Sequence, residues 1–280
     1  MDRDIAGVAW RLPIVWYAFL GGIAAGSYAL SALAALLGGE EDGQATRVAD
    51  CLAFPLVVVC GLLFFVDQSP TGRREATPWG MASLLAMGVL SLGSFLGALV
   101  EDGWLGLSGW SNRVAGLRRS SPGKLFAAAA GCTALAFGAA TGVVRPSAWA
   151  SPTWLGAVLV ASAASTGASA VALLDCWRKA DVTAAAAERL ARAVACTIVL
   201  ELALLTALAL SLRGLAGLAF QRWPGMLIPL FVVPVGLVLP LVLRQSRGAR
   251  GSVDAALLVL LGGFVLRAAV AGIPGSLPFE

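Results

Sequence analysis

The hydrophobic positions of this chain fall into long continuous runs that are separated by short polar breaks. Runs of about 20 apolar residues are long enough to cross the hydrocarbon core of a bilayer as α-helices. The breaks gather charges and turn-forming residues, as at 38–43 and 244–251. We therefore predict an all-α, polytopic membrane protein with eight spans, over residues 13–37, 49–66, 79–100, 124–144, 153–174, 190–212, 225–243 and 253–272.

Two local sequence patterns predict further features of these helices. Pro229, Pro234 and Pro240 make the seventh span the least regular, because each proline removes a backbone donor that neighbouring helices must replace. Small residues crowd the segments 21–26 and 161–169. Such runs let helix backbones approach closely in a membrane, so tight packing is expected there.

Composition agrees with a single integral membrane domain over residues 1–280. The chain is 59% hydrophobic and 13% charged, whereas a soluble domain carries about 25% charged residues. The net charge of +4 does not indicate nucleic-acid binding, since the basic residues are spread over the loops. Most of the 20 lysine and arginine residues lie opposite the termini, which places both termini on the outer, periplasmic side.

Histidine is absent from the whole chain. This excludes a haem held by two histidines, which is the usual cofactor of membrane cytochromes. The five cysteines form no C-x-x-C pair, so we expect no metal site and no iron–sulfur cluster in this chain. Any redox chemistry would then depend on a diffusible carrier or on a cofactor held by a partner.

Two ionisable residues fall inside predicted spans, where charge is costly and often functional. Glu201 lies near the middle of the sixth span, and Arg267 lies closer to the terminal-side end of the eighth. Together they are candidates for a catalytic proton path, and their opposite signs would allow them to pair. The alternatives are a carboxyl that fixes helix packing and an arginine that extends to the interface.

Several polar residues also converge on the terminal-side membrane edge. A quinone ring needs a flat apolar slot, hydrogen-bond donors and a group that exchanges protons. Tyrosine, arginine and aspartate at one edge supply such groups, with Asp67 as the candidate for proton exchange. The residues concerned are Tyr17, Asp67, Gln68, Arg73, Arg74, Thr141 and Arg145.

Four segments of the chain resemble the membrane subunits of the NrfD/PsrC-like family. Tyr17–Gly26 is similar to the opening of that family's first helix, and Asp67–Met81 to its second loop and third-helix start. Thr141–Trp149, leading to Ser162–Ala168, resembles the family's fourth helix end and the start of its second half. The fourth segment is Leu260–Arg267, near the end of the chain.

The resemblance implies two four-helix bundles in the inner membrane of a bacterial or archaeal cell. It also implies a quinone, either menaquinone or ubiquinone, bound near the end of the first bundle. A ferredoxin-like iron–sulfur subunit would face that site, and a catalytic subunit, often molybdopterin-dependent, would sit beyond it. The residues implied to bind the quinone are Tyr17, Gly22, Asp67, Gln68, Arg73, Thr141, Gly142 and Arg145.

The chain departs from the family pattern at two places. The loop after Asp67 lacks the family's Asp-Leu-Gly-Arg-Pro order, and Ala140 stands where a tyrosine is common. If that tyrosine donates to the quinone, this protein lacks or replaces the donor. A purely structural anchor and a proton-translocating subunit that uses Glu201 and Arg267 therefore remain as alternatives.

Overall fold

The computed structural model describes residues 12–38, 43–66, 78–104, 108–142, 152–177, 184–211 and 225–272. Every regular element within these ranges is a helix. Seven described helices are long and apolar enough to cross a membrane, and Ile228–Arg244 is a shorter apolar helix. The prediction of an all-α polytopic membrane protein is confirmed.

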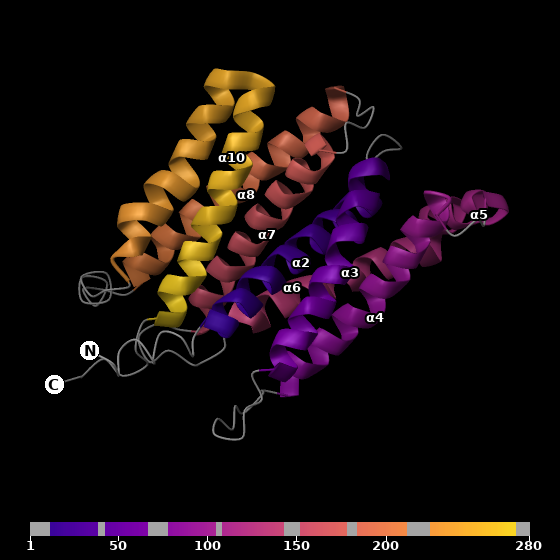
Figure 1. The fold of residues 1–280 in the computed structure, drawn as a ribbon, viewed down its shortest axis with the longest axis horizontal. Coiled ribbons are helices and arrows are strands. Elements are labelled where there is room, and N and C mark those ends of the chain that lie inside the picture. Colours follow the sequence, from indigo (N-terminus) through magenta and orange to yellow (C-terminus); the bar gives the residue numbers. More distant parts are fainter. Residues whose placement is uncertain are drawn as a thin grey trace.

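The described helices follow one another in simple order. They are α2 (Leu12–Leu37), α3 (Gly43–Val66), α4 (Pro78–Glu101), α5 (Ser108–Arg119), α6 (Ser121–Gly142), α7 (Pro152–Trp177), α8 (Ala184–Ser211), η2 (Ile228–Val238) and α10 (Leu239–Gly272). The ribbon of α10 turns back on itself, so that α10 completes the seventh span and also forms the eighth (Figure 1). η2 and the second leg of α10 approach closely at Gly236 and Gly262, where a Cβ on either glycine would collide with the backbone of the other.

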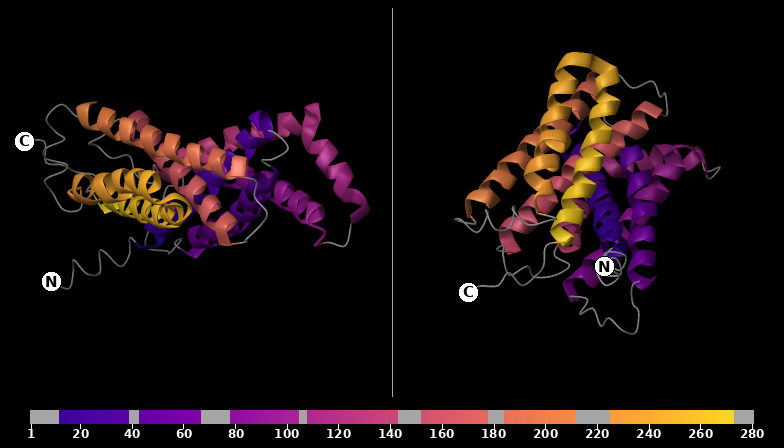
Figure 2. Two further views of the ribbon diagram at one scale, coloured as in Figure 1. Left: turned by 90° about the horizontal axis from the view of Figure 1, so that it is seen from above. Right: turned by 60° about the vertical axis from the view of Figure 1, so that its left-hand side comes forward.

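The helices form two bundles. The first contains α2, α3, α4 and α6, and the second contains α7, α8, η2 and α10 (Figure 1). Both views of Figure 2 keep the orange and yellow helices to one side and α3 and α4 to the other. Tyr28, Met87 and Phe137 are buried in the first core, and Ile198 and Val232 in the second. α2 joins the bundles because it also contacts α7 and α10.

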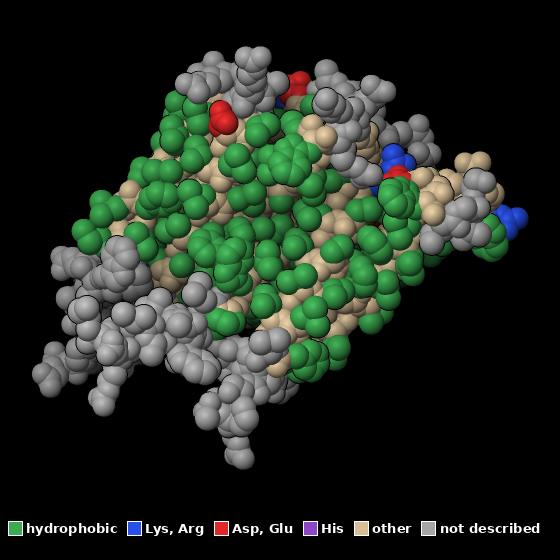
Figure 3. Space-filling view, viewed as in Figure 1, with side chains coloured by type: hydrophobic (Ala, Val, Ile, Leu, Met, Phe, Trp, Pro, Cys, Tyr) green, Lys and Arg blue, Asp and Glu red, His purple; other side chains and the backbone are tan. Residues whose placement is uncertain are grey.

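The outer surface of the bundles is apolar. Hydrophobic side chains cover the middle of the face seen in Figure 3, and the coloured charges lie toward its rim. Leu62, Leu85, Val89 and Leu230 are among the large exposed apolar residues. In water such a surface would be unfavourable, whereas lipid chains solvate it. The distribution is that of helices embedded in a bilayer.

Glycine allows the two bundles to touch along α2 and α7. A Cβ on Gly26 would collide with the backbone carbonyl of Ala163, and one on Gly167 with the backbone of Gly26 and Ser27. Helix association in lipid depends on such close van der Waals contact, since the hydrophobic effect does not drive it there. The small-residue runs at 21–26 and 161–169 therefore pack as predicted.

The seventh span is irregular, in agreement with its prolines. Residues Ile228–Val238 are π-helical, with Pro229 at the start and Pro234 inside. A π-helical turn accommodates a residue that cannot donate in the α-helical pattern. Leu239 begins the regular α-helix, and its backbone N–H donates to the carbonyl of Pro234.

Helix α5 was not predicted from the sequence. Its 12 residues are too few to cross a membrane, and the helix lies at the end of the first bundle (Figure 1). α4 ends at Glu101 and is followed by a turn that contains Gly103, which has φ +75°. Gly103 N–H donates to Val100 and Trp104 N–H donates to Leu99, which is the Schellman pattern that ends helices. The chain then turns into α5.

Candidate functional site

The fold gathers three helix ends at the terminal-side edge of the first bundle. Tyr17 lies in the first turns of α2, α3 ends at Val66, and α6 ends at Gly142. α2 packs against both α3 and α6. Tyr17 is half-buried, and its ring centroid lies 6.2 Å from that of Phe64. Its carbonyl accepts a hydrogen bond from Cys60 Sγ at 3.7 Å.

Much of the predicted quinone site falls outside the described residues. This applies to Asp67, Gln68, Arg73 and Arg145. Thr141 and Gly142 are the last residues of α6, and their side chains also fall outside the description. What the structure does describe is the neighbourhood of the three helix ends that flank these segments in sequence.

Gly22 lies where α2 meets α10. A Cβ at Gly22 would collide with the guanidinium of Arg267. Helix packing therefore requires a small residue at this position. Its predicted role in binding a quinone stays a prediction.

Arg267 and Glu201 are both buried, and neither reaches the surface. Arg267 Nε donates to the carbonyl oxygen of Ala18 at 3.0 Å. Arg267 Nη1 donates to Ser162 Oγ at 3.1 Å and to the carbonyl of Gly263 at 3.2 Å. The arginine thus ties α10 to both α2 and α7, and the interpretation that it extends to the interface is wrong.

Two serines of α7 connect this arginine to Glu201. Ser165 Oγ donates to Glu201 Oε2 at 2.5 Å, and it lies 3.1 Å from the carbonyl oxygen of Ser162. Ser162 and Ser165 are about one turn apart, so they lie on the same face of α7. The resulting network runs from Arg267 through Ser162 and Ser165 to Glu201.

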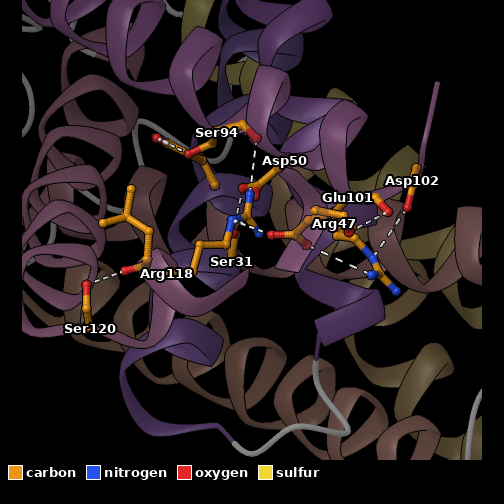
Figure 4. A network of polar contacts seen from close by, with 11 residues as sticks. Ser31, Arg47, Asp50, Ser94, Glu101, Asp102, Arg118 and Ser120 are labelled. Atoms are coloured by element: carbon orange, nitrogen blue, oxygen red, sulfur yellow. Dashed lines mark hydrogen bonds and ion pairs between the residues drawn. The ribbon is translucent and has the colours of Figure 1, made fainter. Parts of the chain in front are cut away.

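A second buried polar cluster lies at the opposite end of the first bundle, and the sequence reading missed it. Asp50 on α3 is 2% exposed. Asp50 Oδ1 accepts a hydrogen bond from Ser31 at 2.6 Å, and Arg118 Nη2 donates to Asp50 Oδ2 at 2.6 Å. Arg118 also donates to the carbonyl of Ser94 at 3.1 Å. Figure 4 shows these side chains converging from α2, α3, α4 and α5.

An outer layer of ion pairs surrounds this cluster. Arg118 Nε lies 3.3 Å from Glu101 Oε1. Arg47 lies 3.9 Å from Glu101 and 3.5 Å from Asp102 (Figure 4). The two arginines therefore face three carboxylates, counting Asp50. The cluster as a whole carries no surplus positive charge.

Beside the cluster is a cavity of about 380 Å³. The hydroxyl groups of Tyr28 and Ser94 meet at 2.9 Å on its wall, and either oxygen can donate. The lining residues are Tyr28, Ser31, Ala32, Ala35, Thr46, Asp50, Gly93, Ser94, Gly97, Val114, Leu117, Arg118, Pro122, Gly123, Phe126, Ala127 and Ala130. Most of these residues are small or apolar.

Asp50 was missed because the second span was predicted to begin at residue 49, where a carboxylate looks like an ordinary membrane-edge group. The helix in fact begins at Gly43, so Asp50 lies about two turns inside it. No glycine or proline stands between Gly43 and Pro55. That unbroken stretch is the signal that would have extended the helix and buried the aspartate.

We expect Asp50 and Arg118 to be strongly coupled. In a double-mutant cycle with Asp50→Ala and Arg118→Ala, the coupling should be about 1–3 kcal/mol, because the carboxylate is buried. The matched control is the exposed pair Glu188 and Arg192 on α8, where Arg192 Nη2 lies 2.6 Å from Glu188 Oε1. Its coupling should be close to zero, because water screens the two exposed charges.

Unfolding free energies measured in bicelles by denaturant titration supply both cycles. Equal coupling for the buried and the exposed pair would contradict the geometry described for Asp50.

Metal chemistry has no evident place among the described residues. Within the described ranges no group of three or more His, Cys, Asp or Glu side chains could hold a metal ion. The cysteines of these ranges are free thiols. The described polar groups can hold a small neutral ligand or pass protons, which are the tasks of hydroxyl, carboxyl and guanidinium groups.

The fold and its buried polar clusters define an integral, multi-pass α-helical membrane protein. The chain belongs to the NrfD family: the family model described as "Polysulphide reductase, NrfD" matches residues 3–273, which is nearly the whole chain. Proteins of this family are membrane subunits of multi-subunit oxidoreductase complexes. None of the curated proteins compared with the chain gives a match.

Proposed function

We propose that this protein is the quinone-reactive membrane subunit of a respiratory oxidoreductase. It would exchange electrons between a membrane quinone, menaquinone or ubiquinone, and a ferredoxin-like iron–sulfur subunit. A catalytic subunit, expected to depend on molybdopterin, would complete the complex. Membership of the NrfD family over residues 3–273 is the observation that carries this proposal.

The proposed quinone site is the terminal-side edge of the first bundle. α2 begins there, and α3 and α6, which both pack against α2, end there. Tyr17 is half-buried, and its ring lies beside that of Phe64. Tyr17 would donate to a ring carbonyl, and Asp67 would exchange the protons that accompany quinone redox chemistry. The remaining residues proposed for this site are Gly22, Gln68, Arg73, Thr141, Gly142 and Arg145.

Electrons must leave the quinone for a centre outside this chain. The chain contains no histidine, so it offers no axial ligands of the usual kind for a haem. An iron–sulfur subunit docked at the terminal-side edge would supply that centre. The protein's own task is then to bind and orient the ring and to manage its protons.

A second candidate function is proton transfer through the second bundle. The network from Arg267 through Ser162 and Ser165 to Glu201 favours it, because buried hydroxyl and carboxyl groups in hydrogen-bond contact can relay protons. Under this proposal, Glu201→Gln abolishes coupling between quinone turnover and proton movement. Turnover itself would continue.

The quinone proposal is tested by substitutions in the assembled complex. Asp67→Asn should lower quinol-dependent turnover by about 100-fold or more, since it removes a general acid–base group. Tyr17→Phe should lower it by about tenfold through the loss of one hydrogen bond. Asp254→Asn is the matched control, because Asp254 is exposed on the opposite side of the membrane domain.

Turnover is measured with a water-soluble quinol analogue after the assembled subunits have been verified by mass spectrometry. If Asp67→Asn and Tyr17→Phe both leave turnover unchanged in intact complex, the protein is a structural anchor instead.

A further inference from the structure

We propose that the 380 Å³ cavity between α2, α4, α5 and α6 binds the head group of a lipid-soluble quinone. This would be a second site, at the end of the first bundle opposite the terminal-side edge. This proposal rests on the proposed function in one respect, which is that the protein binds quinones. The location and the residues are independent of the first site.

The two sites are well separated along α2. The chain has two tyrosines, Tyr17 and Tyr28, and they are 11 positions apart on this helix. At a rise of about 1.5 Å per residue the separation along the axis is about 17 Å. The two tyrosines therefore lie toward opposite ends of the bundle. A quinone held beside Tyr28 cannot occupy the site beside Tyr17.

The volume and the lining of the cavity suit a quinone ring. Its volume falls in the usual range of small-molecule sites, about 300–1,000 Å³. Small residues such as Gly93, Gly97, Ala127 and Ala130 form much of its wall. These small residues leave room for a ring beside larger lining residues such as Phe126. Helix packing does not explain the space, because a packed interior leaves few voids of this size.

The polar groups of the cavity suit a carbonyl. Tyr28 is 1% exposed, and its hydroxyl contacts only Ser94 among the hydrogen-bond partners described for it. Since either oxygen of this pair can donate, one hydroxyl hydrogen is available to a ligand acceptor. Asp50 lies on the same wall and is oriented by Ser31 and Arg118. A quinone carbonyl beside Tyr28 would therefore find both a donor and a nearby carboxyl.

The charges favour a neutral ligand over a phospholipid head group. Arg118 is engaged by Asp50 and Glu101, and Arg47 by Glu101 and Asp102. Two guanidinium groups therefore face three carboxylates. A phosphate would have to displace these carboxylates from the two arginines, which disfavours it. A quinone carries no charge and avoids that penalty.

The cavity reaches the outer surface of the protein through apolar residues. Leu117 and Phe126 line it and are both exposed, as is Gly93. A ligand with a long hydrocarbon tail can enter there and leave its tail in lipid. Helix α5 bounds the entrance, and its Trp110 ring lies 5.3 Å from Arg113 Cζ. Such aromatic and basic pairs are typical of helices at the membrane interface.

The test is photolabelling of the purified complex in quinone-free nanodiscs. The probes are azido derivatives of a short-chain naphthoquinone and of a short-chain ubiquinone, and labelled peptides are mapped by mass spectrometry. We expect labelling of the α5–α6 segment, residues 108–130, in addition to the terminal-side edge. Gly93→Leu should fill the mouth and lower labelling of 108–130 by about tenfold or more.

Two further variants make the result specific. Ala86→Leu places the same side chain on an exposed, non-lining position of α4, and it should leave labelling of 108–130 unchanged. Tyr28→Phe should lower that labelling by about three- to tenfold, the value of one hydrogen bond. Tyr28→Phe removes only a hydroxyl group, so this variant should fold. It therefore provides the test if Gly93→Leu does not fold.

The outcomes separate this proposal from the first. Labelling confined to the terminal-side edge overturns the second site and leaves the proposed function intact. Labelling at neither end overturns both. Labelling of 108–130 that survives Gly93→Leu and Tyr28→Phe is contact with lipid-dissolved probe at the outer surface, and it also overturns the second site.

Discussion

Arg267→Ala is expected to lower the free energy of unfolding by about 3–5 kcal/mol, the range for removing one partner of a buried charged pair. The substitution leaves the carbonyl of Ala18 and the hydroxyl of Ser162 without their donor. It also leaves Glu201 buried without the opposite charge of its network. A void beside Gly22 would add to the loss.

Two further variants serve as controls for Arg267→Ala. Arg192→Ala removes an exposed arginine from α8 and should leave stability nearly unchanged. Arg267→Lys should recover only part of the loss, because one ammonium cannot reproduce the spread of donors that a guanidinium offers. Denaturant titration in bicelles measures all three variants. A loss for Arg267→Ala as small as that for Arg192→Ala would show that the buried network is not formed.

Gly26→Leu is expected to separate the two bundles, with a loss of stability of about 3 kcal/mol or more, at the upper end for overpacking. Its side chain would have to occupy the position of the Ala163 backbone. Backbone atoms cannot move aside as a flexible side chain can. The contact between α2 and α7 would open, and with it the interface that joins the bundles.

Gly61→Leu is the matched control for this substitution. Gly61 also lies within a membrane helix, but a Cβ there meets no atom within 4 Å. Stability should be unchanged or slightly raised, since leucine favours helix over glycine by about 0.8 kcal/mol or less. The two variants are compared by denaturant titration and by crosslinking between α2 and α7. Similar stability for both would contradict the close approach described at Gly26.

The membrane helices were predictable because their signal is repeated along the whole chain. A run of apolar residues such as that from Trp79 to Val100 has few alternatives to a spanning helix. Helix α5 was not predictable in this way, since it is short and polar and depends on contacts with α4 and α6. The seventh span was predicted in part. Its prolines indicate that the helix is irregular, but they do not indicate that it is π-helical.

The buried polar clusters were also predictable only in part. Glu201 and Arg267 were found because they interrupt apolar runs, which is a property of the sequence alone. Their connection through Ser162 and Ser165 depends on how α7 is rotated against α8 and α10, and hydropathy does not contain that information. Asp50 was missed for a different reason, since its burial follows from where α3 begins and from the reach of Arg118 on α5.

Three centres enter the proposals: the terminal-side edge of the first bundle, the opposite end of that bundle, and the second bundle. The terminal-side edge carries Tyr17, the opposite end carries Tyr28 and Asp50, and the second bundle carries Glu201 and Arg267. Electron transfer is proposed for the first centre, a further quinone for the second, and proton movement for the third. Only the first requires an iron–sulfur partner.

The most direct test of the account is whether quinol reduces an iron–sulfur partner through this protein. The complex is purified intact, and its clusters are followed by electron paramagnetic resonance after a menaquinol or ubiquinol analogue is added. We predict that the clusters become reduced, and that complex depleted of this protein shows no such reduction. A purified complex without iron–sulfur clusters, or clusters that quinol reduces equally well without this protein, would contradict the proposed role.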